Sequence, residues 1–236
     1  MTCVDALIRP AGPAPHDTAS HVGSVDGSFH NGPISSFNAW FFSAFEGYIN
    51  HISRRHKKAA FSYVSGDVVV ELGAGTGANF GFLRRGTVVH AVEPSRAMHD
   101  RLREAAVEAG VELHIQPSGA ECLDLPDASV DEVICSLVLC TVDDPQAVVA
   151  EVLRVLRPGG RFRFVEHVAA PDGIRAVVQR AIRRPWGWLF EGCDPHRRTP
   201  ELIEAAGFSS VEIQRRRFRQ SMFWPVNTAA WGIATR

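Results

Sequence analysis

Three closely spaced glycines are the clearest chemical feature of the sequence. Gly73, Gly75 and Gly77 follow the apolar run 67–72 directly. Glycine lets a backbone turn tightly and approach a ligand where a Cβ atom would collide. The glycines also fit a dinucleotide-binding loop, because Glu93 lies about 20 residues further on, where an acid that binds ribose is expected.

Charge favours one of the two ligands that this loop could bind. Glu71 would lie beside the pyrophosphate of a dinucleotide, and the loop has no basic side chain to offset the repulsion. The loop also lacks the lysine of an ATP-binding loop. S-adenosylmethionine (SAM) instead brings an ammonium group, which a carboxylate at this position favours. We therefore expect SAM to be bound by loop residues: Glu71, Gly73, Ala74, Gly75 and Asn79.

Further residues that could contact SAM stand at the ends of later strands. Glu93, which is followed by Pro94, is expected to accept hydrogen bonds from both ribose hydroxyls. Met98 fits either the adenine face or the protein core. Ser136 and Leu137 end the fourth strand, so their backbone is expected to line the methionine end of SAM.

Glu166 and His167 end the fifth strand at the same edge and are the candidate catalytic residues. His167 could act as a general base near neutral pH, or it could simply be a half-buried histidine bonded to a neighbouring loop. A nearby group of potential ligands matches no common zinc spacing, so no metal is expected: Glu191, Cys193, Asp194 and His196.

Short apolar runs alternate with amphipathic segments, which predicts βαβ units and a parallel sheet covered on both faces. Helices are expected from Ser95 to Ala109, from Asp144 to Leu156 and from Thr199. The last two strand-like runs have no helix between them and can pair only as an antiparallel hairpin. The strands are predicted at 67–72, 87–92, 111–115, 129–139, 161–168, 211–218 and 228–235.

The chain divides into three parts. Residues 1–33 are rich in Gly and Pro and predict a flexible leader, whereas residues 34–62 are aromatic and predict helix. That helix could pack on the domain body, form a lid over an apolar substrate, or lie on a membrane surface. The basic residues 54–58 would suit anionic lipid or a solvated helix end. The candidate lid residues are Phe37, Trp40, Phe41 and Phe45, and residues 63–236 form the remaining domain.

Four segments together resemble the class I SAM-dependent methyltransferases of the ubiquinone-biosynthesis-like type. They are the glycine run 71–77, the pair Glu93-Pro94, and the stretches 125–131 and 152–160. This resemblance covers about residues 64–168 and implies an α/β fold: a Rossmann-like, seven-stranded, mostly parallel sheet with an antiparallel C-terminal hairpin strand. Many relatives place an acid against the adenine amino group. For this chain the resemblance implies that adenine is contacted by the backbone around Ala120 and by the side chain of Glu121.

Four shorter phrases are similar to the methyltransferase-like alkyl-thiol methyltransferases, which in animals are membrane-associated. The phrases span residues 75–80, 136–141, 164–169 and 188–193. This similarity implies S-methylation of a small, partly apolar thiol. O- or N-methylation of a secondary metabolite, quinol or lipid head group is the alternative within the class, and a catalytically silent SAM-binding module is the alternative outside it.

Composition excludes other classes of function. A formal net charge of -1 argues against a nucleic-acid coat protein, and the turn after the fourth strand lacks the Asn/Asp-Pro-Pro-aromatic pattern of base amino methylation. We expect a small-molecule acceptor, no nucleic acid and at most weak membrane-surface contact.

Scattered cysteines without a C-x-x-C pair, together with the absence of a signal-peptide pattern, favour the cytoplasm. The oligomeric state stays open.

Overall fold

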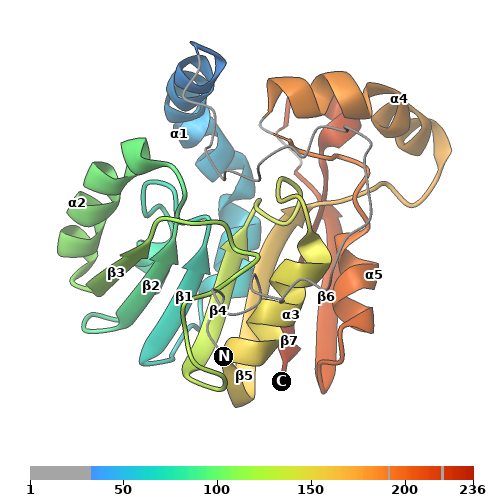
Figure 1. Cartoon of the computed structure of the whole chain (residues 1–236). Coiled ribbons are helices and arrows are strands. Elements are labelled where there is room, and N and C mark those ends of the chain that lie inside the picture. The colour runs from blue at the N-terminus through green and yellow to red at the C-terminus, as the bar shows by residue number, and fades with distance from the viewer. Residues whose placement is uncertain (1–32, 191, 219–220) are drawn as a thin grey trace, which may run out of the picture.

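The computed structural model describes residues 33–190, 192–218 and 221–236, with side chains described from residue 47 onward. The predicted leader lies outside the described residues except for Pro33. Seven strands form one sheet in the order β3-β2-β1-β4-β5-β7-β6 (Figure 1). Their bounds are β1 Val68–Leu72, β2 Val88–Val92, β3 Glu112–Gln116, β4 Val130–Ser136, β5 Leu156–His167, β6 Ser210–Arg217 and β7 Thr228–Thr235.

The pairing confirms the predicted fold class. Strands β1 to β5 pair in parallel, whereas β7 runs antiparallel to both β5 and β6. Strand β4 is shorter than predicted. It ends at Ser136 because Leu137 takes a positive φ of 62°, which turns the chain out of the sheet.

Helices cover both faces of the sheet, as the alternating pattern predicts. Helix α3 (Pro145–Val155) begins at Asp144, whose carboxylate accepts a hydrogen bond from Ala147 N, and α5 (Thr199–Ala205) packs beside it. On the opposite face, α2 (His99–Ala109) packs against β2 and ends at Gly110, which has a φ of 69°. Helix α4 (Gly173–Leu189) was not predicted.

The aromatic segment forms helix α1 (Pro33–Phe61), whose last turn lies on the sheet. Ala60 and Phe61 are fully buried with Val69 of β1 and Val165 of β5. The side chains of Phe37, Trp40, Phe41 and Phe45 lie outside the described part, so their role as a lid stays a prediction. Among the described residues, no helix combines the length and apolar character needed to cross a bilayer.

A buried ion pair attaches α1 to the sheet. The guanidinium of Arg163 contacts the carboxylate of Glu132 and donates to the carbonyl oxygens of Ala60 (3.0 Å) and Tyr63 (2.9 Å). Glu132 also accepts a hydrogen bond from Ser65 N at 2.8 Å. Since both charged side chains are nearly inaccessible to water, these bonds must satisfy them. The pair therefore sets where the end of α1 meets β4 and β5.

Replacing Arg163 by methionine should destabilise the protein strongly. Arg163→Met leaves Glu132 buried and unpaired, which lowers the free energy of unfolding by about 3 to 5 kcal/mol. Urea denaturation measures this loss. The matched control Arg161→Met, at an exposed position of the same strand, should change stability by less than about 0.5 kcal/mol. Equal losses in the two variants would show that the ion pair does not anchor α1.

Candidate active site

A cavity of about 270 Å³ opens at the carboxyl ends of the parallel strands. Helices α1 and α4 lie at this end of the sheet (Figure 1) and both contribute to its lining. The rest of the lining comes from the glycine loop, Met98, the turn after β4, the end of β5, the segment that follows α4 and the segment 221–226. Ligands of open α/β sheets bind at this edge, so the cavity is the candidate active site.

The glycine loop is shaped by positions where no other residue fits. Gly73 has a φ of 58°, and a Cβ atom built on it would lie 2.4 Å from Cγ2 of Val138. Gly77 has a φ of 81°, and its Cβ atom would lie 2.7 Å from that of Ala105. The loop can therefore pack closely against both the turn after β4 and helix α2.

Glu93 holds the glycine loop against the end of β2. Its carboxylate accepts hydrogen bonds from Gly75 N and Ser95 N, each at 2.8 Å. Burial raises the pKa of Glu93, and these two bonds oppose that shift. An ionised carboxylate offers about four acceptor positions, so ribose hydroxyls can still bind. Glu93 does not itself line the cavity, and its contact with ribose stays a prediction.

Glu71 lies fully buried beneath the loop. Its Oε1 accepts a hydrogen bond of 2.7 Å from the side-chain amide of Asn79, and Asn79 lines the cavity. Burial raises the pKa of Glu71 to about 7. Among the described residues, Glu71 Oε2 and Asn79 Oδ1 have no hydrogen-bond partner. Two buried acceptors without a donor fit the ammonium group of SAM, directly or through water.

Lys57 is a cavity residue that the sequence did not reveal. The basic stretch at the end of α1 predicted a solvated or lipid-facing side chain, but Lys57 is only 6% exposed. Its ammonium donates to Asn50 Oδ1 at 2.9 Å and its charge lowers the pKa of Glu71. The sequence placed Lys57 wrongly because α1 continues over the cavity, so that this face of the helix is covered.

The other predicted contacts to SAM divide into two groups. Met98, Ser136 and Leu137 line the cavity, and their contact with SAM stays a prediction. Ala120 is buried in the core cluster that includes residues of β1, β4 and α3, and neither it nor Glu121 lines the cavity. The contacts predicted for Pro94, Ala120 and Glu121 remain predictions.

Glu166, a candidate catalytic residue, lies where it can position the turn after β4, and its catalytic role stays a prediction. The side chain is fully buried and does not line the cavity. Its Oε1 accepts hydrogen bonds from Val138 N (2.9 Å) and Leu139 N (3.0 Å), and its Oε2 accepts one from Cys140 N (3.3 Å). Burial raises the pKa of Glu166, and these bonds oppose the shift. Glu166 thus fixes the turn that follows β4.

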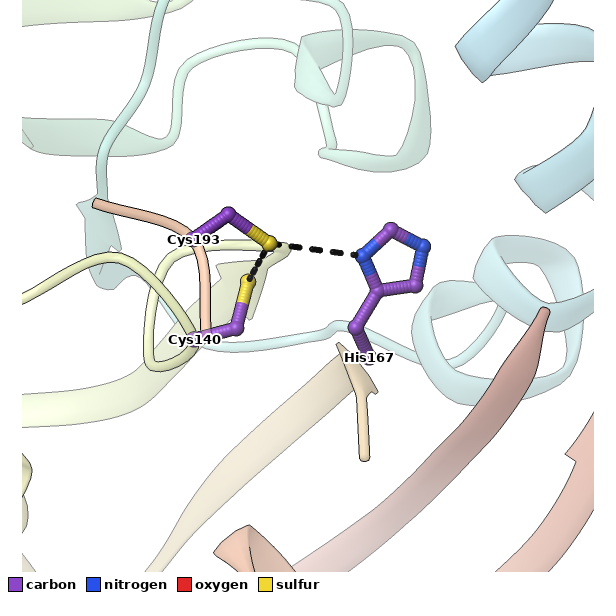
Figure 2. A group of neighbouring side chains, drawn as sticks. All are labelled: Cys140, His167 and Cys193. Atoms are coloured by element: carbon purple, nitrogen blue, oxygen red, sulfur yellow. Dashed lines mark hydrogen bonds between the residues drawn. The ribbon is translucent and has the colours of Figure 1, made fainter. Parts of the chain in front are cut away.

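His167 does line the cavity, where it meets two cysteines (Figure 2). Cys193 Sγ lies 3.8 Å from Cys140 Sγ and 4.0 Å from His167 Nδ1. Hydrogen bonds from Cys140 and His167 lower the pKa of Cys193 well below its usual value. The hydrogen bond to Cys193, together with burial, raises the pKa of Cys140. The sequence singled out His167 and Cys193 separately but did not bring Cys140 to them.

An aromatic wall completes the cavity. Trp186 and Phe190 stack with their ring centroids 4.0 Å apart, and the edge of Phe223 meets both rings. Tyr48 of α1 packs edge-on against Phe223. All four line the cavity. Sequence reasoning placed Tyr48 in the aromatic helix but missed the wall, because α4 was not predicted and because the wall joins segments far apart in the chain.

Comparison with known proteins identifies similar chains. A family described as "Methyltransferase domain" matches residues 70–164. Rat thiol S-methyltransferase TMT1B is 40% identical over 62% of each chain, so the chain spans less than two thirds of that relative. Human thiol S-methyltransferase TMT1B is 36% identical over 67% of this chain and 70% of its own length. The solved structure of a SAM-dependent methyltransferase from Thermotoga maritima superposes with a TM-score of 0.61 at 19% identity, covering 86% of this chain and 99% of the other.

The buried carboxyl of Glu71 predicts a pH-dependent affinity for S-adenosylhomocysteine (SAH). With a pKa of about 7, Glu71 is mostly protonated at pH 6 and mostly ionised at pH 8. Only the ionised form attracts the ligand's ammonium, so binding releases a proton and strengthens as pH rises, by about tenfold over this range. Isothermal titration calorimetry at pH 6, 7 and 8 measures this change in the affinity for SAH.

The variant Glu71→Gln should bind SAH with an affinity that varies little over the same range. Glu108→Gln, on the exposed face of α2, is the matched control and should keep the full dependence. If Glu71→Gln keeps the tenfold change, the carboxyl of Glu71 does not face the ammonium group.

Glu166→Gln should loosen the turn after β4. The amide retains one acceptor oxygen but places an NH₂ group against backbone N–H groups, so charged hydrogen bonds worth about 1.5 to 3 kcal/mol each are weakened. We expect the free energy of unfolding to fall by about 2 to 3 kcal/mol, measured by chemical denaturation. An unchanged stability would contradict the positioning role.

Proposed function

The chain belongs to the family of SAM-dependent methyltransferases that includes the thiol S-methyltransferases, and from this premise we propose that it S-methylates small, partly apolar thiols. SAM supplies a methyl group on a sulfonium, which a nucleophile takes by in-line displacement. Such a reaction needs little covalent help, so the protein contributes alignment and exclusion of water. The residues around the cavity can be assigned to these two tasks.

The cofactor end of the cavity is formed by the glycine loop. There Glu71 and Asn79 would hold the ammonium group of SAM, and the backbone of Gly73 and Gly75 allows close approach. Glu93 keeps the loop closed on β2 through Gly75 N. These residues would direct the methionine end of SAM towards the turn after β4, where Leu137 lines the same cavity.

The acceptor end carries the proposal. Trp186, Phe190 and Phe223 form an apolar wall in the cavity that also holds His167 and two cysteines. An apolar wall stabilises a small hydrophobic acceptor and excludes water from the transfer. A thiolate is intrinsically nucleophilic, so a thiol acceptor needs little from the site beyond an apolar wall that binds it and excludes water. The thiol S-methyltransferases, similar at 36 to 40% identity, point to the same acceptor class.

The remaining expectations form part of the proposal. We propose a small-molecule acceptor and no nucleic acid, with the protein acting in the cytoplasm and making at most weak contact with a membrane surface. The N-terminal half of α1 would serve as the lid of the cavity, since residues from Tyr48 to Lys57 of the same helix line it.

A set of acceptors with one carbon skeleton tests the proposal. Purified protein is given SAM and an aryl thiol, the matching phenol or the matching aniline, and SAH release is measured. We expect the thiol to react at least about tenfold faster, because it ionises more readily and is the better nucleophile. A faster phenol would establish O-methylation, and SAH binding without turnover on any acceptor would establish a silent binding module.

The aromatic wall gives a matched pair of variants for the same assay. Trp186→Ala removes a ring from the cavity and should lower kcat/KM for the aryl thiol by at least about tenfold, while the rise in melting temperature caused by SAH is retained. Trp188→Ala, at a position 72% exposed on the same helix, should leave both readouts unchanged. Equal losses in the two variants would contradict an acceptor site at this wall.

A further inference from the structure

Three side chains that can bind metal converge at the acceptor end of the cavity. Cys140 comes from the turn after β4, His167 from the end of β5, and Cys193 from the segment after α4 (Figure 2). One ligand atom from each residue, namely the two Sγ atoms and a ring nitrogen of His167, all lie within 4.8 Å of one another. Both cysteines are free thiols and buried, so they do not face bulk water.

The spacing of these atoms suits a tetrahedral zinc ion. With Zn–S bonds of about 2.3 Å and Zn–N bonds of about 2.0 Å, tetrahedral angles place two sulfurs about 3.8 Å apart and a sulfur and a nitrogen about 3.5 Å apart. The two Sγ atoms here are 3.8 Å apart, and Cys193 Sγ is 4.0 Å from His167 Nδ1. The third pair, Cys140 Sγ and a ring nitrogen of His167, lies within 4.8 Å, so the imidazole must move towards the two sulfurs to complete three corners of a tetrahedron.

Backbone hydrogen bonds hold the ligands in this arrangement. Asp194 N donates to the carbonyl oxygen of Cys140 at 2.8 Å, which joins the two cysteine segments. Cys140 N donates to the carboxylate of Glu166, the neighbour of His167 on β5. Ligands fixed by such outer bonds bind metal more tightly because less ordering is needed on binding. Two thiolates and a neutral imidazole also balance the charge of a divalent ion in a poorly hydrated site.

We propose that Cys140, His167 and Cys193 bind one zinc ion whose fourth position faces the cavity and takes the sulfur of the acceptor thiol. Three protein ligands and one open position are typical of catalytic zinc. The proposal rests on the proposed thiol acceptor and specifies how that thiol is activated. It replaces the expectation of no metal, which rested only on the spacing of the potential ligands within residues 191–196.

Atoms, protons and electron pairs are conserved in each step of this activation. The acceptor thiol displaces water from zinc, binds as a thiolate, and its proton passes to solvent. The thiolate sulfur then forms a bond to the methyl carbon as the bond from that carbon to the sulfonium sulfur breaks, and the electron pair stays on the sulfur of SAH. The product is a neutral thioether, a weaker zinc ligand than a thiolate, so it leaves. His167 acts here as a ligand and not as a base.

Metal binding is measured without reference to turnover. The full chain is reduced, stripped with a chelator, titrated with zinc, and analysed for metal after gel filtration. We expect about one zinc ion per chain. With cobalt(II) as the probe, we expect the thiolate-to-metal charge-transfer band and the strong visible bands of a tetrahedral site.

Ligand variants distinguish this site from adventitious binding. Cys140→Ser, Cys193→Ser and His167→Ala should each weaken zinc binding by more than about 100-fold, while the rise in melting temperature with SAH shows that each variant is folded. His114→Ala is the control, because His114 is an exposed histidine of β3 outside the three-residue group, and this variant should bind zinc as the parent does. Absence of stoichiometric zinc in the parent, or its retention in all three ligand variants, overturns the proposal.

A spectroscopic titration tests the open position separately from the proposed activity. Adding a small thiol to the cobalt protein without SAM should intensify the charge-transfer band, whereas the alcohol of the same skeleton should leave it unchanged. A spectrum unaffected by the thiol overturns coordination of the acceptor. Failure of thiol methylation in a protein that binds zinc and thiol would instead refute the proposed function and leave the metal site established.

Discussion

The buried carboxylate of Glu166 is the interaction on which the acceptor end of the cavity depends. It lies within the sheet, where its residue pairs with Ala230 of β7, and it accepts hydrogen bonds from three consecutive N–H groups of the turn after β4. That turn includes Leu137, which holds a positive φ, and Cys140. One carboxylate therefore fixes two cavity residues relative to His167, which follows it in β5. Without these bonds, three backbone donors, those of Leu139 and Cys140 buried, would be left unsatisfied.

A second buried carboxylate, that of Glu132, acts at the other end of the sheet. Its pairing with Arg163 attaches the end of α1 to β4 and β5, and α1 in turn carries Lys57 and Tyr48 over the cavity. The sheet thus supplies fixed strand ends, and charged groups within it determine how the covering segments dock. Because the same strands present the glycine loop, the cofactor end and the acceptor end keep one geometry relative to each other.

Much of the fold could be predicted from the sequence because most of its elements are indicated by residues that are close together in the chain. Apolar strands, the glycine loop and the N-cap of α3 at Asp144 each follow from a few neighbouring residues, and the lone antiparallel strand follows from a missing crossover helix. The site could be predicted only in part. Glu71, Gly73 and His167 stand next to strand ends, but the contact of Cys140 with Cys193 joins residues 53 apart in sequence. Lys57 was misplaced because its burial depends on tertiary packing and not on its own segment.

We propose that the methyl donor and the acceptor sulfur meet inside this one cavity. A crystal structure of the protein with SAH and an aryl methyl thioether, the expected product, tests this most directly. We predict that the amino group of SAH lies near Glu71 and Asn79, and that the sulfur of the thioether lies between the sulfur of SAH and the group formed by Cys140, His167 and Cys193. SAH bound elsewhere, or a thioether outside the aromatic wall, would contradict the account.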